Sequence, residues 1–230
     1  MFIVIEGLDG AGKSTQVALI RRLFEKQHRR AVEYLHFPRF DTPVYGDLIA
    51  RFLRGELGTL DQVDPYLVAL LYAGDRQESA PLIRQWLNDG KTVIVDRYVY
   101  SNIAYQCAKL PAEPAGGERA ALKDWILHLE YEHNGIPRPD LSLFLDVPFA
   151  FTEKKLAEQR QGEDRDYLKG KADIHEASLT LQQNVREIYL SCAADDPTFR
   201  VIGCSDPKSG KMLAPELIFN KIADEISRHF

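Results

Sequence analysis

One stretch near the amino end, "FIVIEGLDGAGKSTQ" at residues 2–16, constrains the fold of this chain more than any other. A run of apolar residues precedes Gly7-Leu8-Asp9-Gly10-Ala11-Gly12-Lys13-Ser14, which matches the pattern G-x-x-x-x-G-K-[ST] in full. Glycines at these positions let backbone N–H groups converge on phosphate oxygens, and the dipole of the following helix adds to the attraction. The stretch therefore predicts a strand, a phosphate-binding loop and a helix that together bind a nucleoside triphosphate.

Within this loop, Lys13 is expected to reach the β- and γ-phosphates, and the hydroxyl of Ser14 is expected to coordinate Mg²⁺. The predicted ATP-binding residues of the stretch are Gly7, Asp9, Gly10, Ala11, Gly12, Lys13, Ser14 and Thr15. The motif alone does not distinguish a regulatory GTPase, a motor or transport ATPase and a small-molecule kinase, which share this cradle.

Five apolar segments of strand length alternate with helical patterns along the chain. The predicted strands cover residues 2–6, 31–37, 91–96, 141–147 and 199–203, and clear helical periodicity covers 15–27 and 174–194. Near-continuous Val, Ile and Leu is typical of strands buried on both faces, and their alternation with helices is typical of a parallel sheet. The 230 residues contain no internal repeat and predict one domain, 1–230. Its expected class is α/β, a doubly wound five-stranded parallel sheet flanked by helices.

Three signals mark the bounds of one long helix in the middle of the chain. Asp64 and Pro65 supply an N-cap and a first-turn proline, and Asp89-Gly90 is expected to end the helix before the strand at 91–96. Pro81 lies between them and is expected to kink or split the helix.

Charge and cysteine content narrow the possible partners and compartment. The net charge of −5 argues against a nonspecific nucleic-acid binder, and the longest apolar stretches are far shorter than a membrane span. The apparent first strand begins at once, so no leader peptide is visible. Cys107, Cys192 and Cys204 are odd in number and widely spaced, which matches neither a disulfide framework nor a zinc site. We therefore expect a cytoplasmic protein.

The strand "TVIVDRY" at residues 92–98 supplies further candidate residues for binding phosphate and Mg²⁺. Its Asp96 and Arg97 come at the carboxyl end, which faces the ligand in a doubly wound sheet. Asp96 can hold Mg²⁺ directly or through water, and the planar fork of Arg97 suits phosphate oxygens, although a surface Asp–Arg pair is the alternative. A GTPase would need N-K-x-D, whereas Asn220-Lys221-Ile222-Ala223 lacks the aspartate. A regulatory nucleotide-binding module stays open as an alternative.

Several segments taken together resemble the thymidylate kinase family of nucleoside-monophosphate kinases. They are "IEGLDGAGKST", "HFPRF", "LLYAGDRQE", "VIVDRYVYSNIAYQ", "PDLSLFLDV" and "EDRDY", in the family's order and over roughly residues 2–205. The resemblance implies phosphorylation of dTMP to dTDP by MgATP, with dUMP as an expected further acceptor, and a homodimer. Another nucleoside or nucleotide acceptor is the alternative. The helices at 66–88 and 98–108 are apolar enough for the dimer interface, although their apolar faces could equally belong to the core.

By this resemblance, four residues on predicted helices bind the acceptor base. Tyr72 is expected to stack on thymine, Arg76 to bond the base edge, and Ser101 and Gln106 to read its remaining polar atoms. Each has an alternative role, because helical aromatics are usually core residues, a serine can bond within its helix, and Gln106 could be an ordinary surface residue.

The resemblance also implies residues that bind the sugar and phosphate of the acceptor. Phe37 belongs to the "HFPRF" segment, and Arg39 matches the arginine that grips the acceptor phosphate. Tyr105 corresponds to an aromatic that closes the sugar site and disfavours a 2′-hydroxyl. Asp9 is expected to pair with Arg97 and to lie near the 3′-hydroxyl.

A polar segment at about residues 157–172 resembles the family's mobile lid over the donor phosphates, although a charge run is usually a solvated face. Some family members carry a catalytic arginine directly after the loop carboxylate, where this chain has Gly10. Arg160 and Arg165 are therefore expected to supply that charge, and Tyr167 to lie near the acceptor sugar. The expected catalytic residues are Lys13, Arg97, Arg160, Arg165 and Asp9.

The segment 203–211 ("GCSDPKSGK") follows the last predicted strand, where nucleotide kinases wrap the donor adenine. By the resemblance, Ser205, Asp206 and Lys208 are expected beside that base.

Overall fold

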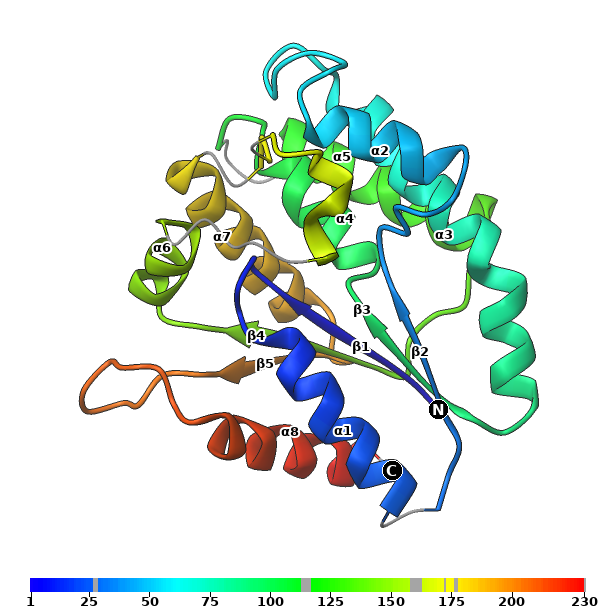
Figure 1. Cartoon of the computed structure of the whole chain (residues 1–230), viewed down its shortest axis with the longest axis vertical. Coiled ribbons are helices and arrows are strands. Elements are labelled where there is room, and N and C mark those ends of the chain that lie inside the picture. The colour runs from blue at the N-terminus through cyan, green and yellow to red at the C-terminus, as the bar shows by residue number, and fades with distance from the viewer. Residues whose placement is uncertain (27–28, 113–116, 158–162, 172, 176–177, 230) are drawn as a thin grey trace.

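Five parallel strands form the centre of the computed structural model, in the order β2-β3-β1-β4-β5 (Figure 1). The strands are β1 (Phe2–Gly7), β2 (Val32–His36), β3 (Thr92–Asp96), β4 (Leu141–Asp146) and β5 (Phe199–Gly203). The structure describes residues 1–26, 29–112, 117–157, 163–171, 173–175 and 178–229. The parallel five-stranded α/β sheet predicted from the sequence is confirmed, with strand bounds that agree to within one residue.

Helices cover both faces of this sheet and separate into two layers. They are α1 (Lys13–Lys26), α2 (Tyr45–Leu53), α3 (Pro65–Asn88), α4 (Val99–Cys107), α5 (Glu118–Leu127), α6 (Phe149–Ala157), α7 (Leu179–Asp195) and α8 (Pro215–His229). A π-helical turn (η1, His128–His133) continues α5, and a 3₁₀ turn (η2, Glu163–Leu168) precedes α7.

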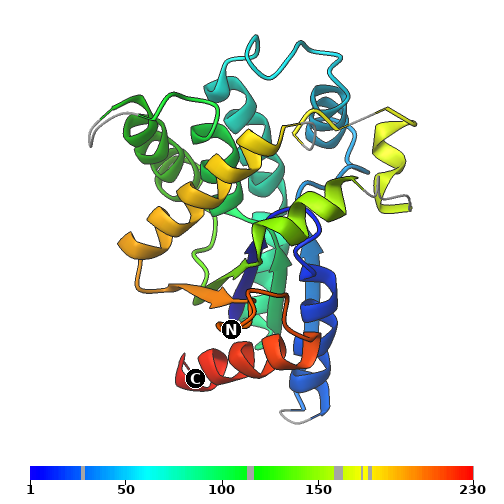
Figure 2. The same cartoon turned by 90° about the vertical axis from the view of Figure 1, so that its left-hand side faces the viewer.

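The side chains of β1 point alternately to the two faces of the sheet and pack in two different hydrophobic clusters. Phe2 and Val4 pack in the cluster formed with α3, α4, α5 and α7, whereas Ile3 and Ile5 pack in the cluster formed with α1 and α8. All four side chains are at most 1% exposed. Figure 2 shows α7 and α8 on opposite sides of β5. Successive residues of a strand point to opposite faces, so a strand covered on both faces must be apolar throughout.

A smaller cluster joins α2 to α3 beside the sheet. Ile49 and Phe52 of α2 are fully buried against Val68 of α3. A Cβ on Gly74 would lie 2.2 Å from the ring of Tyr45, so the close approach of the two helices requires glycine there. This packing sets α2 over the carboxyl end of the sheet.

The structure differs from the sequence expectations at two helices. The Asp64 side chain caps α3 by accepting from the N–H of Tyr66 at 2.7 Å, as predicted, but α3 is continuous through Pro81, so the predicted split is wrong and a kink stays a prediction. The predicted start of α7 near 174 is too early, because the Ser178 side chain caps the helix and accepts from the N–H of Leu181. None of the helices in the described part of the chain is long and apolar enough to cross a membrane.

Candidate active site

The loops that follow β1, β2 and β3 meet α3, α4 and residues of the 166–171 and 173–175 segments around one cavity of about 920 Å³. Because all strands are parallel, their carboxyl ends share one edge, and residues distant in sequence meet there. The predicted residues that line the cavity are Asp9, Gly10, Ala11, Gly12, Lys13, Ser14, Phe37, Arg39, Tyr72, Arg76, Asp96, Arg97, Ser101, Tyr105, Gln106 and Tyr167. The structure thus brings together most of the residues that the sequence singled out.

The loop between β1 and α1 has the geometry of a phosphate cradle. Gly10 and Gly12 adopt φ angles of 76° and 83°, a left-handed conformation that side chains resist. Lys13 Nζ donates to the carbonyl oxygens of Gly7, at 3.4 Å, and of Leu8, at 3.2 Å. These contacts hold the Lys13 ammonium beside the loop, where the oxygens of a bound phosphate would replace the two carbonyl oxygens as its partners.

Asp96 ends β3 beside this ammonium. Its carboxylate is 5% exposed, and Oδ1 has no hydrogen-bond partner among the described residues, although it lies 4.0 Å from Lys13 Nζ. A buried carboxylate oxygen without a donor suits a hard cation, and Ser14 occupies the adjacent first turn of α1. No cluster of three or more His, Cys, Asp or Glu within the described ranges could hold a metal by itself.

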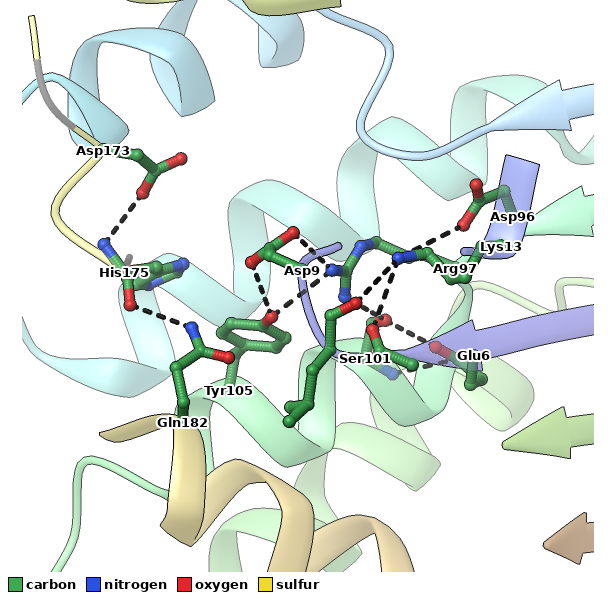
Figure 3. A network of polar contacts seen from close by, with 12 residues as sticks. Glu6, Asp9, Lys13, Asp96, Arg97, Ser101, Tyr105, Asp173, His175 and Gln182 are labelled. Carbon is green, nitrogen blue, oxygen red and sulfur yellow. Dashed lines mark hydrogen bonds and ion pairs between the residues drawn. The ribbon is translucent and has the colours of Figure 1, made fainter. Parts of the chain in front are cut away.

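Arg97 follows Asp96 in a strained conformation and forms the centre of a polar network (Figure 3). Its φ of 67° is rare for a residue with a side chain, and its N–H donates to the carbonyl of Ile5 at 2.9 Å. The guanidinium donates to Asp9 at 2.8 Å and to the hydroxyl of Tyr105 at 3.3 Å. Tyr105 in turn donates to the second oxygen of Asp9 at 2.9 Å. The expected ion pair between Asp9 and Arg97 is therefore present, and the strained backbone of Arg97 makes it a candidate functional residue.

Glu6 of β1 extends this network by accepting hydrogen bonds, and it was not predicted from the sequence. Its fully buried carboxylate accepts from the N–H of Tyr98 at 2.9 Å, from the hydroxyl of Tyr189 at 3.0 Å and from the Ser101 hydroxyl at 2.5 Å. Burial raises the pKa of Glu6, while the Ser101 bond and the charge of Arg97 oppose the rise. Ser101 also accepts from Arg97 at 3.2 Å, so here it supports Arg97, and its contact with the base stays a prediction.

A second buried pair lies on the α3–α4 side of the cavity. Arg76 is 1% exposed and donates from Nε and one Nη to the two oxygens of Glu130, both at 2.5 Å. Asn102 donates its amide NH₂ to Glu130 at 2.9 Å and to the Ala69 carbonyl at 3.0 Å. Its Oδ1 is buried without a partner in the described structure, and the residue lines the cavity. Asn102 was missed, although its position four residues before Gln106 on one helix could have indicated it.

Arg39, expected to grip the acceptor phosphate, lies at the cavity wall with carboxylate partners. Its backbone N–H and Nε donate to Asp75 at 2.9 and 2.8 Å, and one Nη donates to Glu78 at 3.3 Å. Burial raises the pKa of Asp75, and the contacts with Arg39 oppose the rise. Phe37 is 1% exposed and packs on Tyr98 at a centroid distance of 5.9 Å. These contacts fix the β2–α2 loop, and the phosphate-binding role of Arg39 stays a prediction.

Asp166, Tyr167, Asp173 and His175 line the cavity beside α2. Tyr167 stacks on Phe40 with ring centroids 3.7 Å apart, and its hydroxyl donates to Asp173 at 2.8 Å. The imidazole of His175 is 5% exposed and lies 5.1 Å from the ring of Tyr105. Burial holds the pKa of His175 well below its ordinary value, so the ring is neutral at pH 7. Tyr167 thus lies at the cavity wall, and its expected position near the acceptor sugar stays a prediction.

Several predicted residues do not line the cavity. Gly7 and Thr15 flank the phosphate loop, and Ser205, Asp206 and Lys208 lie in a turn after β5. There the Asp206 carboxylate accepts from the N–H groups of Lys208 and Ser209, so it shapes its own loop. Arg160 lies outside the described residues, and only the backbone of Arg165, within η2, is described. The roles of these residues stay predictions.

Fold and site together define a P-loop phosphotransferase whose phosphate loop lines one large cavity with residues of α3 and α4. The family model described as thymidylate kinase matches residues 5–210, and the chain belongs to this family of enzymes. It is 37% identical to the thymidylate kinase of Mycobacterium tuberculosis, over 84% of this chain and 86% of that protein. It is 34% identical to a probable thymidylate kinase of Thermococcus kodakarensis, over 90% of each. The solved thymidylate kinase of Candida albicans superposes with a TM-score of 0.71 at 27% identity, covering 100% of this chain and 93% of that one.

Proposed function

We propose that the chain transfers the γ-phosphoryl group of MgATP to the 5′-phosphate of dTMP, giving ADP and dTDP, the precursor of dTTP. The contact between Asp9 and Arg97 carries the proposal, because it joins the phosphate loop to the acceptor pocket within one cavity (Figure 3). Membership in the thymidylate kinase family identifies the acceptor.

The reaction needs positioning and charge neutralisation more than acid–base chemistry. A phosphate oxygen of dTMP, already ionised at neutral pH, attacks the γ-phosphorus as the bond to the β-bridging oxygen breaks. Lys13 and Arg97 stabilise the negative charge spread over the transferring group, and Arg39 orients the acceptor phosphate. Ser14 and Oδ1 of Asp96, which has no hydrogen-bond partner among the described residues, would hold Mg²⁺, and the ion would supply further charge neutralisation.

Two residues of the acceptor pocket select the base through the polarity of their hydrogen bonds. Arg76 can only donate, and Asn102 offers an acceptor because its NH₂ already serves Glu130 and Ala69. Thymine and uracil present a carbonyl at position 4 and an N–H at position 3, which complement this pair. Cytosine presents the opposite polarity at both positions, so its binding would leave buried groups unpaired.

An acceptor panel tests both the activity and the base selection. We expect kcat/KM for dUMP to be lower than for dTMP by about 10- to 200-fold, because one small apolar group is worth about 1–3 kcal/mol. For dCMP we expect a further loss of about 10²-fold or more from the two mismatched hydrogen bonds. The measurement is acceptor-dependent ADP release with dTMP, dUMP, dCMP, dGMP and AMP. If dTMP is not among the best acceptors, the proposed substrate is wrong. ATP binding without acceptor-dependent turnover would instead indicate a regulatory module.

We further propose that residues 157–172 act as a lid whose arginines complete the donor site, since Gly10 leaves the loop without one. Arg165→Ala is expected to lower kcat by about 10²-fold or more while KM for dTMP changes little, because the charge is needed mainly in the transition state. Lys169→Ala, in the same segment, is the matched control and should leave both constants near their original values. A larger effect of Arg165→Ala on KM for dTMP than on kcat would place Arg165 on the acceptor.

The assembly and compartment belong to the same proposal. Leu67, Leu70 and Leu82 of α3 are 60%, 47% and 40% exposed, which supports a homodimer interface on this helix. Every residue of α4 is buried within the single chain, which favours α3 over the segment 98–108 as the surface of this interface. Three buried free cysteines are compatible with the reducing cytoplasm.

A further inference from the structure

Lys109, two residues beyond the end of α4, is a charged residue that the mechanism above does not use. Its Nζ donates to Oε1 of Gln106 at 2.7 Å and lies 4.7 Å from the centre of the Phe52 ring. Its backbone N–H also bonds the Gln106 carbonyl at 3.2 Å. No carboxylate within the described part of the chain lies close enough to Nζ to form an ion pair. A partly buried lysine whose Nζ bonds to a side-chain amide must fix the orientation of that amide.

The polarity of this contact follows from the chemistry of the two groups. An ammonium can only donate, so the amide oxygen of Gln106 has to face Lys109. The NH₂ group then faces away from Lys109, on a residue that is 1% exposed and lines the acceptor cavity. Gln106 also follows Asn102 by four residues, which places both on one face of α4.

We propose that Lys109 is a positioning residue that fixes the amide of Gln106, so that the pocket offers a hydrogen-bond donor to a carbonyl oxygen of the acceptor pyrimidine. With Arg76 and Asn102, the pocket then presents donor, acceptor and donor. Thymine and uracil carry the complementary edge of O4, N3–H and O2. This inference rests on the proposed function and names the third hydrogen bond of its base recognition.

The surroundings of Lys109 make the contact sensitive to pH. Burial lowers the pKa of Lys109 to about 7. The groups that face it are Phe52 from α2, the neutral His175 from the 173–175 segment, and Gln106 itself. On the α7 side, the uncharged Asn184 reaches the neighbouring carbonyl of Ala108. A deprotonated amine has a lone pair and can accept from the Gln106 NH₂, so above this pKa the amide can turn over and the donor is lost.

Four variants test the inference: Lys109→Met, Lys109→Arg, Gln106→Ala and the double variant Lys109→Met/Gln106→Ala. With ATP saturating, we expect Lys109→Met to raise KM for dTMP about tenfold, with kcat and KM for ATP within about threefold. Lys109→Arg keeps the donors and should recover most of the affinity. In the Gln106→Ala background, Lys109→Met should raise KM for dTMP by less than about twofold, because the two residues act as one unit. A merely structural lysine would instead give equal effects in both backgrounds.

The wild-type pH profile supplies a test that needs no loss-of-function variant. From about pH 6 to about pH 8.5, KM for dTMP should rise more in the wild type than in Lys109→Arg, because arginine stays protonated. Comparing the two proteins cancels the ionisation of dTMP itself. Additive effects of Lys109→Met and Gln106→Ala, or identical pH profiles, would overturn the inference. Absence of dTMP turnover in the wild type would instead overturn the proposed function.

Discussion

Arg97→Ala is expected to lower kcat by about 10³-fold or more while the protein stays folded. The guanidinium of Arg97 lies between the phosphate loop and the acceptor pocket, where Asp9 and Tyr105 hold it in place. Charge that develops on the transferring phosphoryl group is stabilised most strongly by a donor that needs no reorganisation, and a single such arginine is worth about 10³–10⁵ in related phosphoryl transfers. Steady-state ADP release with both substrates saturating measures the loss.

The backbone of Arg97 offers a control that separates chemistry from stability. At φ = 67° an alanine remains strained, whereas a glycine does not. Arg97→Gly should therefore match Arg97→Ala in lost turnover but unfold at a higher denaturant concentration than Arg97→Ala. Arg138→Ala, which removes an exposed arginine paired with Glu132, should leave kcat unchanged. Near-normal turnover of Arg97→Ala would remove this residue from the mechanism.

Features of the site that depend on local chain chemistry could be predicted from the sequence. The spacing of the glycines and the lysine in Gly7–Ser14 predicts phosphate binding. Strands of continuous apolar residues predict a parallel sheet that is covered by helices on both faces. Topology then brings Asp96 and Arg97 to the edge where this loop lies. These positions needed no knowledge of side-chain packing.

Partners that depend on packing between distant elements could not be predicted in this way. In the sequence, Glu6 is indistinguishable from any other residue of its strand. Its role as a hydrogen-bond acceptor is visible only in the folded chain, where Ser101 of α4 and Tyr189 of α7 donate to its carboxylate. Glu130 lies in a π-helical turn whose sequence carries no recognisable signal. Sequence periodicity shows which face of an element is apolar, but it does not show which polar group on another element will satisfy a buried charge.

Glu130 carries the largest expected effect on stability. Its carboxylate is fully buried and accepts two bonds from Arg76, which is itself 1% exposed, and one from Asn102. Glu130→Ala leaves the guanidinium buried without a counter-charge, which typically costs about 3–5 kcal/mol. We therefore expect the free energy of unfolding to fall by about that amount, measured by urea denaturation. The matched control is Glu132→Ala in the same turn. That residue is 62% exposed and pairs with Arg138 at the surface, so the cost should stay below about 1 kcal/mol.

A double variant separates the structural role of this pair from its role in binding. Replacing both partners by apolar residues, as in Arg76→Met/Glu130→Leu, removes the unpaired charge and should recover most of the lost free energy of unfolding. It also removes the donor for the base, so KM for dTMP should rise by about 10²-fold or more because the base carbonyl would be buried without a partner. A destabilisation by Glu130→Ala no larger than that by Glu132→Ala would mean that Arg76 has another counter-charge. If the double variant regained dTMP affinity together with stability, Arg76 would hold the fold without reading the base.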